Sequence, residues 1–510
     1  MPFQKMKRVR IEGTDEQKAI WREVQHGENH VQVVARAGTG KTTTMIEGLN
    51  RCRSRIINKG VQVGITTFAK AGADELERKV PKRVWAGTLH RLGLRILRDN
   101  HPDVGIDRKK SFGIAKRVWD RFGSRPRKGE LKATVRFADL LKQNGWLVSE
   151  VSEKRRTDLD ELIARYGIVW RGNRRALFDL VQVIMLESQI EDATVDFADM
   201  LWLPYVLELQ GWKFDWLVVD ESQDLNRVQQ HLALNNARRL IVVGDPSQSI
   251  YGFRGAEVDG MTKMAEYLSV GSPLTHLPLT TCWRCPNEVI ALAQKLVPSI
   301  RARPDAEDGE IHFLSEGSAE AELQPGHMVL CRTNAPLFSL ICRLWKLEVT
   351  SYGQGTDYAK TLLDLVDYLE DHGAGNMLEL KACLGTWYQN QRRYLEDSKA
   401  SKAALSALED RYQCLRVMAD ASYTIGDLRK RLGKVGRDSI GSKDAVRLST
   451  IHRAKGLEAD HVTILSPELL PHPMAEHKED LRQEENIAYV AVTRAKRSLT
   501  FAGELPKYFR

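Results

Sequence analysis

The chain has 510 residues, which is too many for one hydrophobic core and predicts three or four domains. Its hydrophobic content of 42% and charged content of 28% are ordinary for a globular protein. No apolar run reaches the roughly 18–20 residues that span a bilayer, and the basic start, Met1 to Arg10, lacks the apolar stretch of a secretory signal. The formal charge of +9 is compatible with a polyanionic partner without demanding one.

The seven cysteines are an odd number spread over a long chain, which favours a reducing interior and a cytoplasmic protein. Cys282 and Cys285 form a lone Cys-x-x-Cys pair, with no second pair at zinc-finger spacing. We therefore expect both to be ordinary free thiols without a metal or redox role.

A glycine-rich turn follows the first apolar run of the chain and precedes a helical pattern. Its sequence is Ala-Arg-Ala-Gly-Thr-Gly-Lys-Thr, residues 35–42. Gly38 and Gly40 let backbone N–H groups close around phosphate oxygens, Lys41 supplies a mobile positive charge, and the Thr42 hydroxyl can hold Mg²⁺. The turn is therefore predicted to bind a nucleoside triphosphate.

A stretch rich in Lys, Arg and Trp at helical spacing, from about Leu92 to Thr194, lacks strand-like runs. Its basic residues can form a solvated helical face or an arm that faces a DNA duplex or strand, and both interpretations stay open. These residues are Arg108, Lys109, Lys110, Lys116, Arg117, Arg121, Arg125, Arg127, Lys128, Lys132 and Arg136.

A pair of carboxylates, Asp220 and Glu221, ends the apolar run Trp216–Val219. Beside a phosphate-binding turn, a carboxylate at a strand end can hold the same Mg²⁺, and the next can polarise a water molecule. The two segments together predict hydrolysis of a nucleoside triphosphate.

Strand-like runs that alternate with helical patterns predict an α/β fold with parallel sheets and crossover helices. The runs are Val31–Val34, Val63–Thr67, Trp216–Val219, Leu240–Val243, Met328–Cys331 and Val462–Leu465. They fall into two groups, so we expect two cores, each interrupted by a mainly helical insertion. The expected parts are residues 1–91 and 195–275 for the first core, 92–194 for its insertion, 276–351 and 444–510 for the second core, and 352–443 for its insertion.

Further segments complete a recognisable series from Thr14 to Lys496. Besides the turn and the acidic pair, the series comprises Thr14–Gln17, Thr66–Lys70, Gly87–His90, Val243–Ala256, Trp283–Arg284, Arg332–Asn334, Ser449–Glu458 and Ala488–Lys496. In this order they resemble the UvrD/Rep family of superfamily 1 helicases. The resemblance implies two RecA-like P-loop cores with ATP and Mg²⁺ in the cleft between them, and single-stranded DNA lying across both.

The resemblance also assigns roles by motif position. Gln17 would read the adenine edge, Trp283 would stack on adenine, and Glu458 would contact the ribose. Gln248 would sense the γ-phosphate, and Asp220 and Thr42 would hold Mg²⁺. Glu221 would activate water, and Arg284 and Arg494 would be arginine fingers. The turn residues Gly38, Thr39, Gly40, Lys41, Thr42 and Thr43 would cradle the phosphates. Outside such motifs, an arginine of this kind is most often a surface salt-bridge residue.

The DNA path implied by the resemblance contains aromatic rings, which stack on any base, and polar side chains. Its residues are Phe68, His90, Tyr251, Phe253, Arg254, Arg332, Asn334 and His452. For the aromatic residues the alternative is core packing. Three positions depart from the family pattern: Trp283 and Phe253 replace a usual Tyr and Trp, and Asn486 replaces a usual Arg, which puts a salt bridge there in doubt.

We expect an ATP-dependent DNA helicase or translocase that moves 3′ to 5′ on single strands and acts at single-/double-strand junctions.

The second insertion is shorter than in large family members, and its centre, about 398–419, is expected to be dispensable for the motor. A nuclease partner is plausible, and no nuclease domain or basic tail is recognised near the end. The alternatives are an ATP-gated DNA sensor, which should show a large apolar patch on the second insertion, and an RNA motor, which ranks low because no residue is recognised as reading a 2′-hydroxyl.

Overall fold

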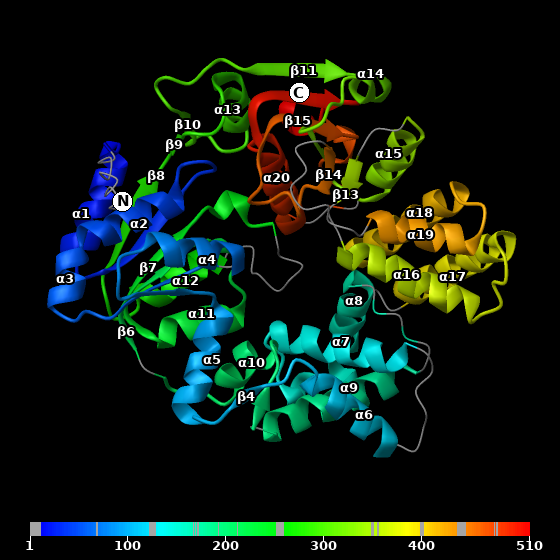
Figure 1. Ribbon diagram of the computed structural model, residues 1–510, viewed down its shortest axis with the longest axis horizontal. Helices are drawn as coiled ribbons and strands as arrows, with labels where there is room; N and C mark the ends of the chain where they lie inside the picture. Colours follow the sequence, from blue (N-terminus) through cyan, green and yellow to red (C-terminus); the bar gives the residue numbers. More distant parts are fainter. Residues whose placement is uncertain are drawn as a thin grey trace, which may run out of the picture.

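The computed structural model describes residues 12–510 except 68–69, 122–128, 167, 169, 171–172, 192, 212, 251–259, 348–350, 354–355, 398–401, 436–444, 474 and 476–477. In Figure 1 the first core lies at the left, the second core at the top, the first insertion at the bottom and the second insertion at the right. None of the described helices is long and apolar enough to cross a bilayer.

The first core is a six-stranded parallel sheet with the order β3-β2-β6-β7-β1-β8. One face packs on the helices near the N-terminus, and the other packs on α5, α10, α11 and α12. The strands are β1 (His30–Ala35), β2 (Val63–Thr66), β3 (Val84–Gly87), β6 (Phe214–Val219), β7 (Ala237–Gly244) and β8 (Leu274–Leu279). The helices are α1 (Asp15–His26), α2 (Lys41–Arg51), α3 (Arg53–Asn58), α4 (Lys70–Lys79), α5 (Leu89–Asn100), α10 (Asp199–Val206), α11 (Arg227–Asn235) and α12 (Gly260–Ser269), with short η3 (Ser222–Asp224) and η4 (Pro246–Gln248).

The second core is another six-stranded parallel sheet, with the order β11-β16-β15-β12-β14-β13. Its strands are β11 (Glu310–Leu314), β12 (Met328–Cys331), β13 (Ser351–Gly353), β14 (Val446–Thr450), β15 (Ala459–Leu465) and β16 (Ala495–Ala502). Its helices are α13 (Asn287–Gln294), α14 (Glu316–Ala321), α15 (Ala335–Lys346) and α20 (Lys478–Val492), with η6 (Pro467–Leu469) and η7 (Lys507–Phe509). A separate ladder pairs β9 (Thr281–Cys282) with β10 (Arg301–Ala302).

The expectation of two parallel α/β cores is confirmed, and all six apolar runs coincide with strands. Six further strands, β3, β8, β11, β13, β14 and β16, complete the two sheets. β11 has mostly exposed or half-buried residues, and β8 contains Pro278, so neither reads as a buried run. Because β8 pairs with β1, the first sheet extends to Leu279, past the expected boundary at 275.

The first insertion is a helical lobe with its own apolar core. Its helices are α6 (Lys110–Arg121), α7 (Glu130–Gln143), α8 (Arg156–Tyr166) and α9 (Arg174–Ile190), with η1 (Val148–Glu150) and η2 (Glu153–Arg155). Contrary to the expectation of no strands, β4 (Gly105–Ile106) and β5 (Thr194–Val195) pair at its base. This ladder holds the entry and exit of the insertion side by side.

Lys110 does not belong to a basic surface, as its sequence context suggested, because its side chain is fully buried. Its Nζ lies 2.9 Å from Asp199 Oδ2, and Nζ of Lys142, also fully buried, lies 2.8 Å from Asp199 Oδ1. Burial alone would raise the pKa of Asp199, but the two ammonium groups outweigh it and lower this pKa. Arg117 and Arg121 are exposed but pair with acidic residues of the same lobe.

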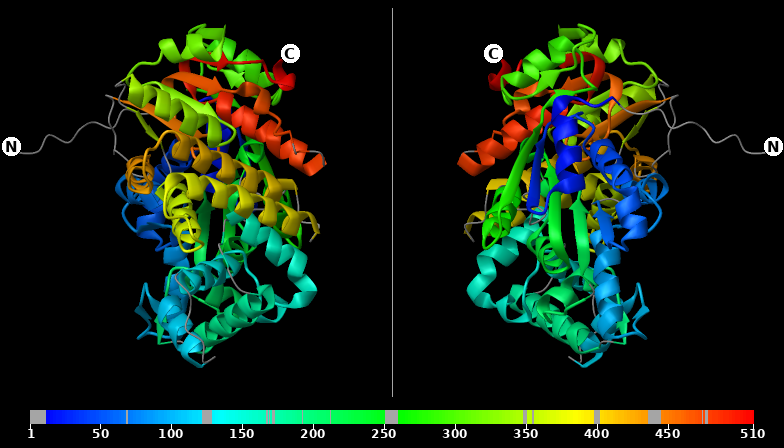
Figure 2. Two further views of the ribbon diagram at one scale, coloured as in Figure 1. Left: turned by 90° about the vertical axis from the view of Figure 1, so that its right-hand side faces the viewer. Right: turned by 90° about the vertical axis from the view of Figure 1, so that its left-hand side faces the viewer.

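The second insertion consists of α16 (Thr356–Glu370), α17 (Met377–Asp397), α18 (Lys402–Asp420) and α19 (Ile425–Val435). As Figure 2 shows, these helices lie between the second core and the first insertion. The apolar side chains of these helices are packed into a core that they share with α15 and the second sheet.

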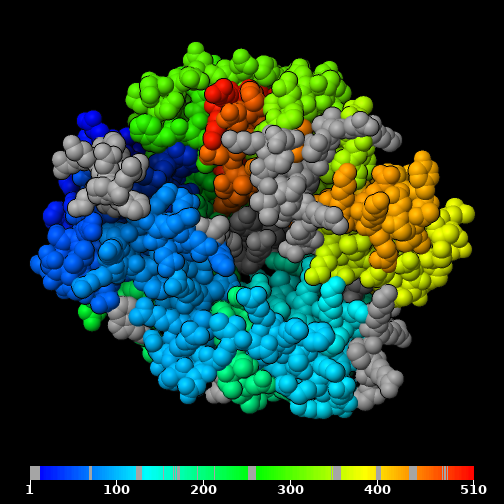
Figure 3. Space-filling model, in the orientation of Figure 1, coloured from blue at the N-terminus to red at the C-terminus, as the bar shows by residue number. Residues whose placement is uncertain are grey.

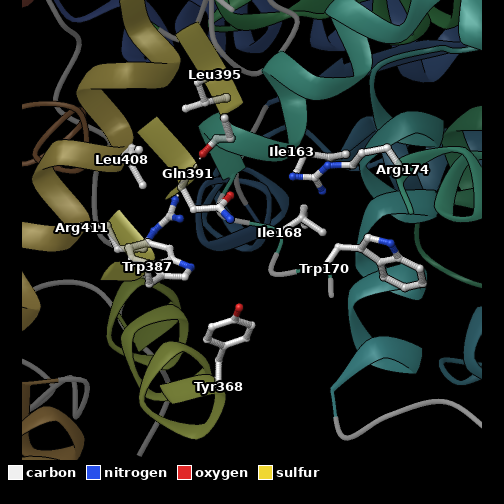
Figure 4. A pocket seen from close by; sticks show the side chains of 11 residues that line it. Ile163, Ile168, Trp170, Arg174, Tyr368, Trp387, Gln391, Leu395, Leu408 and Arg411 are labelled. Carbon is white, nitrogen blue, oxygen red and sulfur yellow. Dashed lines mark hydrogen bonds between the residues drawn. The ribbon is translucent and has the colours of Figure 1, made fainter. Parts of the chain in front are cut away.

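The two insertions contact each other through α7 and α8 of the first and α16, α17 and α18 of the second. Tyr394 donates a hydrogen bond to Asp160 at 2.7 Å, Lys132 pairs with Asp364 at 2.6 Å, and Arg411 donates to the carbonyl of Ala164. Figure 4 shows the small pocket of about 30 Å³ that remains between them, lined from both sides.

The centre of the second insertion is more integrated than expected. It contains α18, whose Asp410 accepts hydrogen bonds from the backbone and side chain of Asn334 in the second core. Leu408, Leu415 and Met418 of the same helix are buried in the shared core. Removal of about 398–419 would therefore expose the second core, and the structure argues against that segment being dispensable.

The buried charges of the first insertion generate a stability prediction. Asp199→Ala should destabilise the lobe by about 3–5 kcal/mol at pH 7, because it leaves two buried ammonium groups without their shared counter-charge. Asp199 has a lowered pKa, so its contribution is present above its unfolded pKa and is lost as the pH falls. Urea unfolding followed by circular dichroism measures the change. Glu75→Ala, which breaks an exposed pair with Lys79, should shift stability by less than about 0.5 kcal/mol, and equal effects would contradict the prediction.

Candidate nucleotide-binding site

The phosphate-binding turn links β1 to α2 as predicted. Gly38 and Gly40 adopt left-handed φ values of 67° and 74°, which side chains rarely tolerate, and Gly40 caps α2. Lys41 and Thr42 form the first turn of α2, where the free N–H groups and the helix dipole favour an anion. The Thr39 hydroxyl donates to the carbonyl of Arg36 at 2.9 Å and closes the turn.

The acidic pair follows β6 and faces this turn. Thr42 donates a short hydrogen bond to Asp220, and Lys41 Nζ lies 3.2 Å from Glu221 Oε2. Burial raises the pKa of Asp220 to about 6, helped by the charge of Glu221. Burial also acts to raise the pKa of Glu221, but Lys41 and Lys455 outweigh it and lower this pKa to about 2. Glu221 is therefore the more acidic member of the pair.

The side-chain oxygen atoms of Asp220 and Thr42 fit a magnesium ion. Mg²⁺ prefers carboxylate and hydroxyl oxygens, and the Asp220 carboxylate and Thr42 hydroxyl already lie in contact. A divalent cation would also lower the pKa of Asp220 and keep it ionised.

Gln17 lies in α1 and contacts α2, and Thr43 lies in the first turn of α2. Gln17 is buried in a capping box with Thr14, and its amide donates to the Thr44 hydroxyl of α2 at 3.1 Å. Thr43 is exposed in the first turn of α2.

The second core contributes two arginines, of which Arg284 lies against the turn and Arg494 is held within the second core, near enough to feel the charge of Glu221. Arg284 donates from Nε to Glu458 at 2.6 Å and from Nη1 to the carbonyl of Thr493 at 3.1 Å. Arg494 is fully buried and donates from Nε to the Val490 carbonyl at 2.9 Å. Burial, with the charge of Arg284, lowers the pKa of Arg494 to about 10, which leaves it charged at neutral pH.

The two cores meet at Gly38. A Cβ atom at this position would lie 2.7 Å from Cys282 Sγ and 2.9 Å from the Cβ of Arg284. The backbone N–H of Trp283 donates to the Gly38 carbonyl at 2.9 Å, while the indole of Trp283 is 43% exposed and available for stacking. The phosphate-binding turn and the loop of Trp283 and Arg284 are therefore in direct contact.

Comparison with protein families agrees with this geometry. Residues 16–268 match the model of the UvrD/REP helicase N-terminal domain, and residues 389–503 match the UvrD-like helicase C-terminal domain. The chain belongs to the UvrD/Rep helicase family. Both matched regions contain residues of the site. The N-terminal match contains the turn and the acidic pair, and the C-terminal match contains Glu458 and Arg494.

Three curated relatives show the extent of the similarity. The chain is 25% identical over 307 residues to DNA helicase II of Salmonella typhimurium, 27% over 259 residues to ATP-dependent DNA helicase PcrA of Staphylococcus aureus, and 25% over 318 residues to ATP-dependent DNA helicase srs2 of Schizosaccharomyces pombe. These matches cover 55%, 46% and 55% of this chain. They span only 41%, 33% and 34% of the relatives' own lengths.

Several contacts that cross between the cores of this UvrD/Rep-family chain were not assigned from the sequence. Lys455 donates to Asp224 Oδ1 and to the carbonyl of Gln248, both at 2.5 Å. Within the first core, the Gln248 amide donates to Asp245 at 2.8 Å. Asn486 forms no salt bridge, but donates to the carbonyls of Pro246 at 3.2 Å and Ser249 at 3.0 Å. The N–H of Ala37 donates to the Tyr489 hydroxyl at 3.0 Å, and Arg36 donates to Ser299 at 2.8 Å. Arg36, Lys455, Asn486 and Tyr489 stand in or beside motif segments, which was the available signal.

A cavity of about 810 Å³ lies where the cores and insertions meet, and Figure 3 shows the surface hollowed near this centre. His90 and Arg453 line it, together with Lys132, Arg136 and Lys360 of the insertions. Carboxylates line it as well, namely Asp139, Asp224 and Asp364. Among these, Asp224 connects the cavity to the nucleotide side through Lys455.

The other expected DNA contacts are distributed differently. Arg332 makes a bidentate pair with Glu484, with Nε 2.9 Å from Oε2 and Nη2 2.6 Å from Oε1, and the Asn334 amide donates to Asp410 at 2.7 Å. His452 is half-buried beside Arg453. Phe68, Tyr251, Phe253 and Arg254 lie outside the described residues.

The contact at Gly38 generates a prediction with a matched control. Gly38→Ala and Gly40→Ala both strain a left-handed residue, by about 1–2 kcal/mol. Only the methyl group at residue 38 would collide with the second core, since nothing lies within 4 Å of a Cβ at Gly40. Without nucleotide, Gly38→Ala should therefore speed maleimide labelling of the buried Cys282, and Gly40→Ala should not. Labelling followed by peptide mass mapping measures this, and equal rates would show that Gly38 does not hold the cores together.

Proposed function

We propose that this protein is an ATP-dependent DNA helicase or translocase that moves 3′ to 5′ on single-stranded DNA. The observation that carries the proposal is the meeting of a phosphate-binding turn and an acidic pair on one core with two arginines from the other. Phosphoryl transfer requires the neutralisation of spread negative charge from several directions, and arginines from a second domain supply it only when the cores are together.

The side chains divide the chemistry among them. Lys41 and the free N–H groups of α2 would bind the phosphates, and Asp220 and Thr42 would hold Mg²⁺, which neutralises charge on the phosphates when bound. Glu221 is ionised at neutral pH, so it can orient and deprotonate the attacking water. Arg284 and Arg494 stabilise the negative charge of the transition state.

Hydrolysis is linked to DNA through the contacts between the cores. Lys455 binds both Asp224, which lines the central cavity, and the carbonyl of Gln248, the expected γ-phosphate sensor. DNA in that cavity and nucleotide at the turn would therefore bias the same arrangement of the cores, and their affinities would be reciprocally coupled. His90 and the cations of the cavity suit a DNA strand.

The alternative of an ATP-gated sensor lacks its expected feature in the described part of the second insertion. There, Leu378 and Tyr423 are the exposed large apolar side chains, which is less than the extended patch that docking of a protein partner calls for. A nuclease or other protein partner therefore has no surface evidence in its favour among these residues.

Strand displacement with purified protein and ATP tests the proposed function. A 3′-tailed duplex should be unwound, while 5′-tailed and blunt duplexes should not, and ATP hydrolysis should rise with poly-dT. Unwinding only of the 5′-tailed duplex would overturn the polarity. Hydrolysis that is indifferent to DNA would overturn the motor.

Replacement of the proposed base should separate binding from chemistry. Glu221→Gln should retain ATP binding but lower turnover by about 10²–10⁴-fold, because the charge that activates water is lost while the turn remains intact. Lys41→Ala should weaken ATP binding as well. Binding of a fluorescent ATP analogue and single-turnover hydrolysis measure the two effects. Near-normal turnover of Glu221→Gln would show that another group is the base.

Replacement of Lys455 should weaken the link between DNA and hydrolysis. Lys455→Met removes the charge that joins Asp224 to the Gln248 carbonyl, so the ratio of DNA-stimulated to unstimulated ATP hydrolysis should fall about tenfold or more. Lys381→Met, which breaks an exposed pair with Asp420 within the second insertion, serves as the control and should keep the ratio. An unchanged ratio in Lys455→Met would place the coupling elsewhere.

A further inference from the structure

Two cysteines frame the loop that carries Trp283 and Arg284. Cys282 ends β9, and Cys285 precedes Pro286, the N-cap residue of α13. The backbone N–H of Cys285 donates to Cys282 Sγ at 3.5 Å, and the Cys285 thiol donates to the Thr493 carbonyl at 3.6 Å. The loop is therefore a two-residue turn whose ends are held by sulfur.

Cys282 is chemically unlike the other cysteines. The neighbouring Cys285 side chain, with the backbone N–H groups of Cys285 and Arg284, outweighs burial and lowers the pKa of Cys282 to about 6. By contrast, burial raises the pKa of Cys52 to about 11 and that of Cys331 to about 12. Since the thiolate is the form that reacts with oxidants, Cys282 is the favoured site of attack.

The first core covers Cys282. The residue is fully buried, and its sulfur lies against Gly38 so closely that a Cβ there would be 2.7 Å away. Ala37 and Ile250 of the first core belong to the same apolar cluster. Separation of the two cores would therefore uncover the sulfur, whereas a closed cleft shields it.

We propose that Cys282 and Cys285 form a redox-active dithiol that a peroxide converts to a disulfide, which holds the Trp283–Arg284 turn in a form that cannot serve the nucleotide. The Cys282 thiolate attacks the peroxide O–O bond, giving a sulfenic acid and hydroxide. The Cys285 thiol then displaces water from the sulfenic acid and forms the S–S bond. Two thiols are thus oxidised by two electrons while one hydrogen peroxide becomes two waters.

The effect on hydrolysis rests on the proposed function and follows from the contacts of the loop. A disulfide draws the sulfur atoms to about 2.05 Å and removes the S–H group that Cys285 donates to Thr493. Arg284 donates to the same carbonyl, and Thr493 immediately precedes Arg494. Both proposed arginine fingers would therefore be displaced together.

Oxidation of the full chain tests the proposal. After hydrogen peroxide treatment and alkylation, peptide mass mapping should find a Cys282–Cys285 disulfide. DNA-stimulated ATP hydrolysis should fall at least tenfold, since an arginine finger contributes about 10³–10⁵ in rate, and dithiothreitol should restore it. Cys285→Ser should form no such disulfide and escape reversible inhibition. Cys383→Ser, at a partly exposed cysteine outside the loop, should behave like the wild type.

Two results would overturn the dithiol. One is oxidation of Cys383 by peroxide while Cys282 and Cys285 stay reduced. The other is a protein that carries the Cys282–Cys285 disulfide and still hydrolyses ATP at the rate of the reduced protein. Mass mapping of the wild-type chain needs no variant and no activity. A reduced protein that does not hydrolyse ATP would therefore contradict the proposed function, and the presence or absence of the disulfide would still decide whether the thiols react.

Discussion

The close approach of two loops at Gly38 is the constraint on which the rest of the site depends. A residue without a side chain allows the phosphate-binding turn of one core to lie against Cys282 and Arg284 of the other, with no room for a methyl group. That contact brings the charges of both cores to one place. Lys455, Asn486 and Tyr489 reinforce it with polar contacts to the first core. The cleft is therefore an interface whose fit is set by backbone as much as by side chains.

This arrangement lets the Lys455 cation contact two regions of the first core at once. Lys455 lies between the acidic segment of the first core and the loop that ends at Gln248. Burial raises the pKa of Asp224 to about 6, although Lys455 opposes the rise. The ion pair is thus finely balanced and sensitive to any movement that brings water or another charge toward it. A DNA strand in the adjacent cavity, as proposed above, would be one such charge.

Much of the fold could be predicted because buried parallel strands are continuous apolar runs, and the nucleotide motifs could be recognised because backbone geometry restricts which residues can form them. The remainder depends on tertiary packing that the sequence does not display. Lys110 reads as one of many surface cations, yet it is buried against Asp199. β11 and β8 lack the pattern of a buried strand because one is largely exposed and the other contains a proline. The partners of Lys455 and Asn486 are more than 200 residues away along the chain.

The two-residue ladder of β4 and β5 has a consequence for folding. The first core must pair β2 with β6, although the whole first insertion lies between them in sequence. Closing a flexible loop of that length carries an entropic penalty that delays pairing of distant strands. By pinning its own two ends together, a lobe that folds first turns this long detour into a short connection. The insertion then behaves as a self-closing appendage, and the sheet can assemble nearly as though the lobe were absent.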